Sequence, residues 1–136
     1  MLITPTLHFQ GQCEEAIALY RQAFDLRTSF ILHYSDADQR DWDVPLTGEQ
    51  LSYVYHSEAY IGEQRLMLAD EIGLASAGSR SLFLTVTFKT DDRVRQAYEV
   101  LTREGSIIHP LHSTTYSSCM ASIMDKFGFR WGLMTE

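Results

Sequence analysis

Two histidines, His109 and His112, stand at a spacing that would let two imidazoles bind one metal ion. They flank Pro110, so the segment is not helical and the two rings need not converge. Zinc sites need three or four convergent ligands, and we therefore interpret the pair as exposed loop side chains. The single histidines His8 and His33 fall in presumed strands, where a hydrogen-bonded strand residue is the simpler interpretation.

Cys13 and Cys119 are the two cysteines of the chain. Cys119 would be a nucleophile if a nearby base or cation lowered the pKa of its thiol. Most buried cysteines are inert packing residues, and we favour that interpretation. Two isolated thiols imply no disulfide framework and suit a reducing cytoplasm.

Alternation along the last predicted hairpin places Arg130, Gly132 and Met134 on one face, with Cys119 opposite. If that face lines a pocket, Arg130 is its one cation and would hold a carboxylate or phosphonate by a bidentate contact. The alternative is a structural ion pair with a nearby acid such as Asp70. We favour the ion pair, because arginines in sheets usually have structural partners.

The third predicted strand offers two alternating pairs of side chains, Tyr55 with Ser57 or His56 with Glu58. Counting across the turn that follows, and assuming that Leu68 faces inward, favours Tyr55 and Ser57 as the pair that lines a pocket. A slip of one residue in the register would reverse this assignment.

The composition limits the function classes. The chain has 136 residues and a net charge of -7, with 45% hydrophobic and 21% charged residues, which is typical of one globular domain. Its 11 basic residues form no cluster, which disfavours nucleic acid and anionic membranes as partners. No apolar run approaches the roughly 20 residues that span a bilayer, and no signal-peptide pattern occurs. We therefore expect a cytoplasmic protein.

The first half of the chain predicts a strand, a helix and three further strands. Residues 13–24 switch to helical spacing after the break at Gly11. The polar, acidic stretch 35–50 around Trp42 predicts a long loop, which is either a lid or a solvated segment. The predicted strands are 2–9, 28–34, 51–61 and 64–70.

The second half repeats this order after a linker over 71–80. A helix begins at a cap residue, Asp91 or Asp92, and runs to Glu104, where Gly105 ends it as a left-handed stop. The predicted strands are 81–88, 106–109, 116–124 and 129–134. We expect an α+β fold with two βαβββ modules, 1–70 and 81–136, in a single domain over 1–136, because each module leaves one sheet face that needs cover.

Three segments carry a resemblance to a known family: "ITPTLHFQGQCEEAIALYRQAF", "YHSEAYIGEQRLMLAD" and "MDKFGFRWGLM". They resemble the PhnB-like branch of the vicinal oxygen chelate superfamily, which includes glyoxalase I, bleomycin-resistance proteins, fosfomycin-resistance enzymes and extradiol dioxygenases. The resemblance covers nearly the whole chain. It implies glyoxalase-like modules of curled mixed sheet that form a cup, with helices on the outer face, and a homodimer.

In metal-using members of the superfamily, the first and last strands of each module each supply one ligand. The resemblance places these positions at Pro5, Leu68, Thr85 (or a neighbour) and Gly132. Pro5, Leu68 and Gly132 offer no side-chain ligand atom, and Thr85 lacks the imidazole, thiolate or carboxylate that zinc and nickel need. We therefore expect no metal and no cofactor.

The leading hypothesis is a metal-independent homodimer that binds a small molecule of unknown identity; whether it is an enzyme stays open. Its pocket, lined by Tyr55, Leu68, Ala121 and Met134, would be mostly apolar. The candidate ligand-binding residues are Tyr55, Ser57, Leu68, Asp70, Cys119 and Arg130.

Two other hypotheses remain. One is a metal-dependent lyase, isomerase or dioxygenase with relocated ligands, for which the candidates are His56, Asp70, His109 and His112. The other is an interaction protein that uses only its dimer surface. The chain has no glycine-rich loop after a first strand that would bind a methyl donor, and no nucleophile elbow, P-loop or dinucleotide fingerprint.

Overall fold

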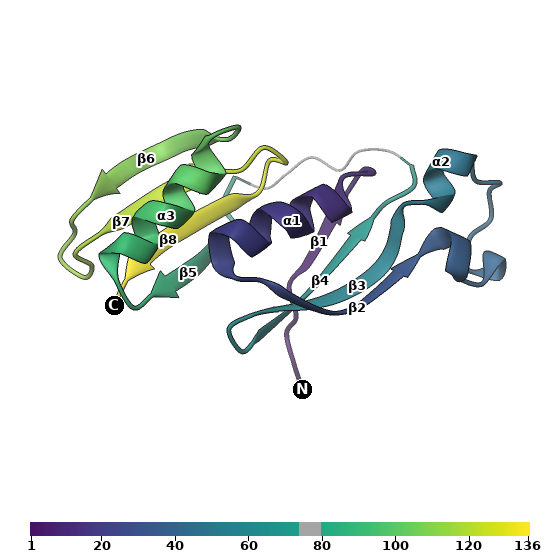
Figure 1. Ribbon diagram of the computed structural model, residues 1–136, viewed down its shortest axis with the longest axis horizontal. Helices are drawn as coiled ribbons and strands as arrows, with labels where there is room; N and C mark the ends of the chain where they lie inside the picture. The colour runs from purple at the N-terminus through teal and green to yellow at the C-terminus, as the bar shows by residue number, and fades with distance from the viewer. Residues whose placement is uncertain (74–79) are drawn as a thin grey trace. The chain divides into compact units, whose positions relative to one another are not determined.

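The two halves of the chain fold into two four-stranded mixed sheets, each with a helix across one face, in a computed structural model (Figure 1). The structure describes residues 1–73 and 80–136, so most of the predicted linker over 71–80 lies outside the described residues. The chain divides into two compact units, Met1–Ala75 and Ser76–Glu136. The predicted α+β fold with two βαβββ modules is confirmed.

The first unit has the strand order β1-β4-β3-β2, in which β1 runs parallel to β4 and the other neighbours are antiparallel. Its elements are β1 (Thr6–Phe9), α1 (Cys13–Phe24), β2 (Arg27–His33), the 3-10 turns η1 (Tyr34–Asp36) and η2 (Gln39–Asp41), α2 (Gly48–Leu51), β3 (Val54–Ile61) and β4 (Gln64–Asp70).

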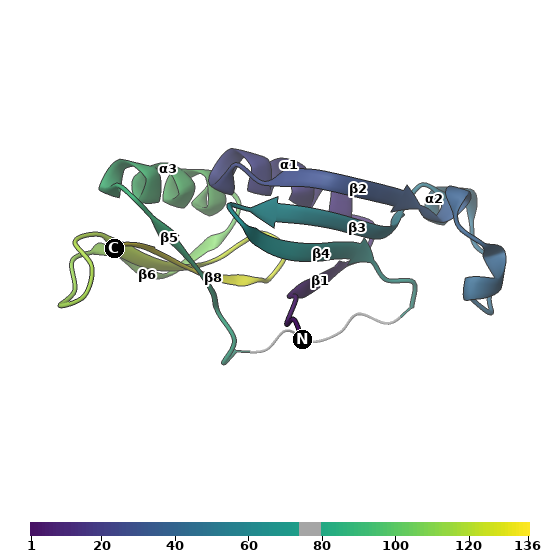
Figure 2. The same ribbon diagram turned by 90° about the horizontal axis from the view of Figure 1, so that it is seen from below.

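Helix α1 covers one face of this sheet (Figure 2). The covered face carries Leu7 and Phe9 of β1, and the Phe9 ring lies 6.5 Å from the ring of Tyr20 on α1. The strand register aligns Leu7 with Leu68, and Leu68 with Ser57, so these side chains share the covered face. Burial of this face supplies most of the apolar core of the unit.

Two details of the first unit differ from the sequence prediction or add to it. Helix α1 ends where Asp25 takes a left-handed conformation, φ 56°, and its N–H donates to the carbonyl of Arg21. The predicted loop over 35–50 contains short helices. The longest, α2, forms because Thr47 and Gln50 make a reciprocal capping box.

The second unit repeats the arrangement with the strand order β5-β8-β7-β6, in which β5 runs parallel to β8. Its elements are β5 (Leu84–Phe88), α3 (Asp91–Thr102), β6 (Ser106–His112), β7 (Met120–Met124) and β8 (Arg130–Thr135). Helix α3 covers one face, which carries the buried side chains of Trp131 and Leu133. Trp131 therefore packs on the helix side of the second sheet.

The ends of α3 correct two predictions. The cap residue is Thr90, whose hydroxyl accepts from the N–H of Arg93, while Asp91 and Asp92 lie in the first turn. Gly105 is not in the left-handed region, and the helix ends at Thr102. A Cβ at Gly105 would lie 2.4 Å from the backbone oxygen of Met124, so close packing explains this glycine.

Candidate functional site

Each sheet also has a face on the side away from its helix. In the first unit this face carries Thr6 and His8 of β1, Arg65 and Met67 of β4, and His56, Glu58 and Tyr60 of β3, as the strand registers require. No helix from the described part of the unit covers it (Figure 2). We call it the first helix-free face.

Ionisable groups gather on the first helix-free face. The Glu58 carboxylate pairs with the Arg65 guanidinium, and it lies 3.8 Å from Nε2 of His56. Glu58 is only 28% exposed, and the ring of Phe30 lies 6.1 Å from that of His56. A carboxylate held between a cation and an imidazole, beside an aromatic ring, can bind a polar ligand group or exchange a proton with it.

His8 forms a separate pair on this face. Its Nδ1 lies 3.3 Å from the Glu71 carboxylate, and both side chains are about two-fifths exposed. No group of three or more His, Cys, Asp or Glu side chains that could hold a metal ion occurs within residues 1–73 and 80–136.

The second helix-free face is the corresponding face of the other sheet. It carries Arg130, Gly132 and Met134 of β8, as predicted from alternation. Their partners on β7 are Met124, Ser122 and Met120, and Thr85 and Thr87 of β5 lie beside Gly132 and Met134. The Arg130 guanidinium lies 5.7 Å from the centre of the Phe83 ring, a cation–π contact.

The structure places Ser57 and Leu68 together, but against α1. Both are fully buried, and the Ser57 hydroxyl donates to the carbonyl of Leu68 at 2.6 Å, while its oxygen shares a hydrogen bond with the thiol of Cys13 on α1. The predicted inward assignment of Ser57 and Leu68 is therefore wrong by one residue, and the helix-free face carries His56 and Glu58 instead. The sequence contains two alternating faces, and only the helix contacts show which one is covered.

Asp70 also lies on the covered face, where it is 3% exposed. One carboxylate oxygen accepts from the N–H groups of Gly11, at 2.8 Å, and Cys13, at 3.0 Å. The other oxygen accepts from the N–H of Val54 at 2.9 Å. Asp70 therefore satisfies backbone donors at the start of α1, which is a structural task.

Tyr55 belongs to an aromatic cluster that holds the 35–53 segment. Its ring lies 4.8 Å from that of Tyr34 and 5.6 Å from that of Trp42. Its hydroxyl donates to the Asp41 carboxylate at 2.9 Å, and this hydrogen bond raises the pKa of Tyr55. The half-buried Trp42 is thus anchored on the sheet by its ring contacts.

Both thiols are buried, and neither is placed for nucleophilic chemistry. Burial, reinforced by the Asp70 carboxylate, raises the pKa of the Cys13 thiol to about 12. Burial also raises the pKa of Cys119, which sits with Ala121 on the covered face of the second sheet. Ala121 pairs with Leu133, so it does not lie beside Met134 as the predicted pocket required.

The four positions inferred for metal ligands divide between the faces. Leu68 is on the covered face, and Pro5 follows the same alternation as Leu7, with its carbonyl accepting from the N–H of Met67. Thr85 and Gly132 are neighbours on the second helix-free face. At the first helix-free face the residues nearest these positions are Thr6 and Met67, which pair with each other.

Alternation in the sequence predicted that Arg130 shares a face with Gly132 and Met134, but it did not identify the Glu58–Arg65 pair or the methionines Met120 and Met124. The spacing of Glu58 and Arg65 across a hairpin turn is a signal that could have found the pair, since the two lie on the same face of neighbouring strands. Whether the six predicted residues contact a ligand stays a prediction.

Comparison with solved structures shows the same fold over the full chain. The protein PA1353 from Pseudomonas aeruginosa has a TM-score of 0.83 at 22% identity, covering 100% of this chain and 98% of its own. A putative 3-demethylubiquinone-9 3-methyltransferase, the PhnB protein from Bacillus cereus, has a TM-score of 0.82 at 25% identity, covering 100% of both chains.

A more distant neighbour is a glyoxylase/bleomycin resistance protein/dioxygenase domain from Frankia sp. EAN1pec. It has a TM-score of 0.68 at 11% identity, covering 99% of this chain and 96% of its own. No curated protein matches the chain. A sequence model of the family described as 3-demethylubiquinone-9 3-methyltransferase matches residues 1–134. The chain belongs to this PhnB-like family, and its fold is that of the glyoxalase and bleomycin-resistance proteins.

Proposed function

We propose that this protein is a metal-independent homodimer that binds a small organic molecule on its helix-free faces. The observation that carries the proposal is the half-buried cluster of Glu58, Arg65 and His56, which lies beside Met67 and Phe30 on a face without a helix. Ligand sites typically combine a few placed polar groups with apolar surroundings, as this face does.

The covered faces support the proposal by contrast. Their polar groups, such as Asp70 and Ser57, are used within the fold, and no buried side-chain nitrogen or oxygen in the described residues lacks a hydrogen-bond partner. The polar groups of the covered faces are therefore not available to a ligand, in contrast to those of the helix-free faces. The location we expect is still the cytoplasm. No helix among the described residues is long and apolar enough to cross a membrane.

The family description names a methyltransferase, and we do not extend that activity to this chain. The first strand–helix junction is closed by the Asp70 carboxylate, which already binds the N–H groups of Gly11 and Cys13. The start of α1 is thus filled by the protein's own side chain.

A metal-dependent lyase, isomerase or dioxygenase is the alternative function. Among its candidate ligands, Asp70 is engaged by backbone donors, and His56 belongs to a different unit from His109 and His112. Metal analysis after gentle purification separates the two functions. We expect less than about 0.1 equivalent of any transition metal per chain, and a stoichiometric ion would establish the alternative.

Homodimer formation is supported by the edge strand β2, where Phe30 is 47% exposed and Ile31 is 36% exposed. Apolar side chains on an exposed edge favour association. Light scattering should give twice the chain mass of 15.6 kDa. Phe30→Ser together with Ile31→Thr should shift the mass toward that of the monomer. A wild-type protein that already has the mass of a monomer would contradict the dimer.

Ligand binding is tested by a melting-temperature screen of organic acids, amines, aromatics and sugars. A ligand present at about 100 times its Kd stabilises the folded state by roughly 2.7 kcal/mol, which gives a clear shift. Glu58→Gln with Arg65→Gln should abolish or weaken the shift for ligands of the first helix-free face. Failure of every class to raise the melting temperature would reject the binding function.

A further inference from the structure

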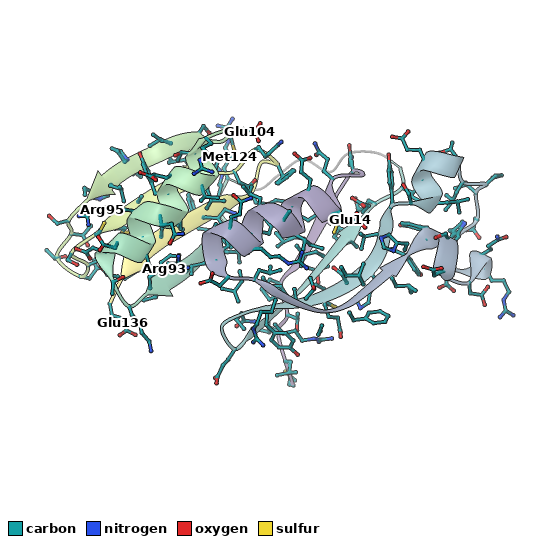
Figure 3. All side chains as sticks on the ribbon, viewed as in Figure 1. Glu14, Arg93, Arg95, Glu104, Met124 and Glu136 are labelled. Carbon is teal, nitrogen blue, oxygen red and sulfur yellow. The ribbon has the colours of Figure 1, made fainter. Side chains whose placement is uncertain are left out.

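The internal methionines all lie on helix-free faces. The chain has five methionines, of which Met1 begins it and Met67 is on the first helix-free face. Met120, Met124 and Met134 are on the second, with Met124 at the end of β7 (Figure 3). Thioethers are polarizable, adapt their shape and make favourable contacts with aromatic rings.

Gly132 lies at the centre of the second helix-free face. Its neighbours across the strands are Ser122 and Thr85, and Arg130 and Met134 flank it along β8. A Cβ at this position would lie 2.7 Å from the Thr85 hydroxyl oxygen, so only glycine leaves that side chain in place. A glycine inside a strand marks a place where another group approaches the backbone closely.

The second helix-free face carries one fixed positive charge in a protein whose net charge is -7. Arg130 supplies the charge, and the register pairs His109 with Ser122 and His112 with Met120. None of the positions assigned to this face, all within the described residues, carries a carboxylate. At its edge, the Tyr116 hydroxyl donates to the Met120 sulfur at 3.0 Å.

We propose that the second helix-free face binds a planar aromatic anion, which is a more specific form of the function proposed above and rests on it. The aromatic ring lies over Gly132 and contacts the thioethers of Met120, Met124 and Met134. The carboxylate or sulfonate of the ligand pairs with Arg130, whose planar guanidinium matches such groups in a bidentate contact.

The first helix-free face does not fit the same ligand. Its arginine, Arg65, is paired with Glu58, so an incoming anion would have to displace a carboxylate. On the second face no described acid pairs with Arg130, which lies over Phe83. Charge complementarity therefore assigns the anion to the second face.

The test is isothermal titration of the full chain with 1-naphthoate. Two probes isolate the parts of the ligand: 1-naphthamide keeps the ring and loses the charge, and cyclohexanecarboxylate keeps the charge and loses the aromatic ring. We expect 1-naphthoate to bind about ten- to hundredfold more tightly than 1-naphthamide, the usual effect of one charged hydrogen-bonded contact. Cyclohexanecarboxylate should also bind more weakly.

Two substitutions locate the site. Arg130→Gln should weaken 1-naphthoate binding about tenfold or more and leave 1-naphthamide binding unchanged. The matched control is Arg27→Gln, because Arg27 also lies over an aromatic ring, that of Tyr60 at 6.0 Å, on the other sheet. This control should leave both affinities unchanged. Arg130→Lys, which keeps the charge, should have an intermediate effect even if Arg130→Gln lowers stability.

The outcomes separate this inference from the broader function. Equal affinity for 1-naphthoate and 1-naphthamide, or an Arg130→Gln variant that binds 1-naphthoate normally, overturns the aromatic-anion site. If naphthoate fails while another class in the melting screen binds, the inference fails and the binding function stands. If no class binds, both fail.

Discussion

Asp70 is a candidate ligand-binding residue in the sequence, but in the structure both of its carboxylate oxygens accept hydrogen bonds from the backbone. It ends a strand in one of the segments that carry the family resemblance, and a free carboxylate there would suit a ligand. Its two oxygens instead accept from the N–H groups of Gly11, Cys13 and Val54. Those donors come from positions up to 59 residues away along the chain, and no local pattern reveals them.

Replacing Asp70 should therefore destabilise the first unit strongly. In Asp70→Ala the three N–H donors lose their acceptor, and each buried unsatisfied donor costs roughly 1–3 kcal/mol. We expect the free energy of unfolding to fall by about 3 kcal/mol or more, measured by urea denaturation. Trp42 fluorescence reports the first unit and Trp131 fluorescence the second.

The control for Asp70 is Asp43→Ala, which removes the same charge from an exposed position of the same unit. It should change the free energy of unfolding by no more than about 0.5 kcal/mol. A decrease in the free energy of unfolding of less than about 1 kcal/mol in Asp70→Ala would show that the carboxylate does not stabilise the start of α1.

The buried thiol of Cys13 makes stability depend on alkaline pH. Its pKa is about 12 in the folded protein and 9.0 in the reference state, so the unfolded chain loses this proton first as the pH rises. The stabilisation is complete below about pH 9 and disappears as the pH rises toward 12. Between pH 9 and 11, wild type should lose up to about 1.4 kcal/mol per pH unit more than Cys13→Ala. Parallel stability profiles for the two proteins would contradict this.

At the scale of elements, the two strand–helix junctions are each stabilised by a polar side chain from the neighbouring parallel strand, but the residues differ. Asp70 is the partner of Phe9 at the first junction, and Thr135 is the partner of Phe88 at the second. The Thr135 hydroxyl donates to the Asp91 carboxylate at 3.0 Å, and Ser118 donates to the same carboxylate. These bonds lower the pKa of Asp91, Ser118 contributing most.

Two substitutions at the start of α3 test whether Thr90 is the cap residue of the helix. Thr90→Ala removes the side-chain cap and should cost about 1 kcal/mol of unfolding free energy. Asp92→Ala should cost no more than about 0.5 kcal/mol, because Asp92 is exposed and its nearest cation, Arg95, is 3.4 Å away. Thermal denaturation followed by circular dichroism measures both, and the opposite ranking would show that Asp92 is the cap.

The elements that could be predicted from the sequence are those set by local periodicity. The predicted bounds of α1, 13–24, and of β4, 64–70, agree with the structure. The α3 cap was missed because Thr90 precedes two acids that also suit a helix start. The face of β3 was missed because alternation fixes two faces, while the contact of Ser57 with Cys13 decides which is covered.

For the whole molecule, the repeated strand order and the family match identify the fold, whereas the site depends on side chains that differ between the two halves. The first helix-free face is an ion-paired surface around Glu58, and the second is a thioether surface around Gly132 with one arginine. The two units therefore share a topology but differ in the chemistry of their helix-free faces, so the function of each face has to be argued from its own side chains.

The most direct test of the central claim is the Kd of the best organic ligand from the screen, measured by calorimetry before and after exhaustive dialysis against a chelator. We predict that the two values agree within about twofold, since the proposed contacts come from side chains alone. Loss of binding after dialysis, restored by adding zinc, nickel or manganese, would contradict the account.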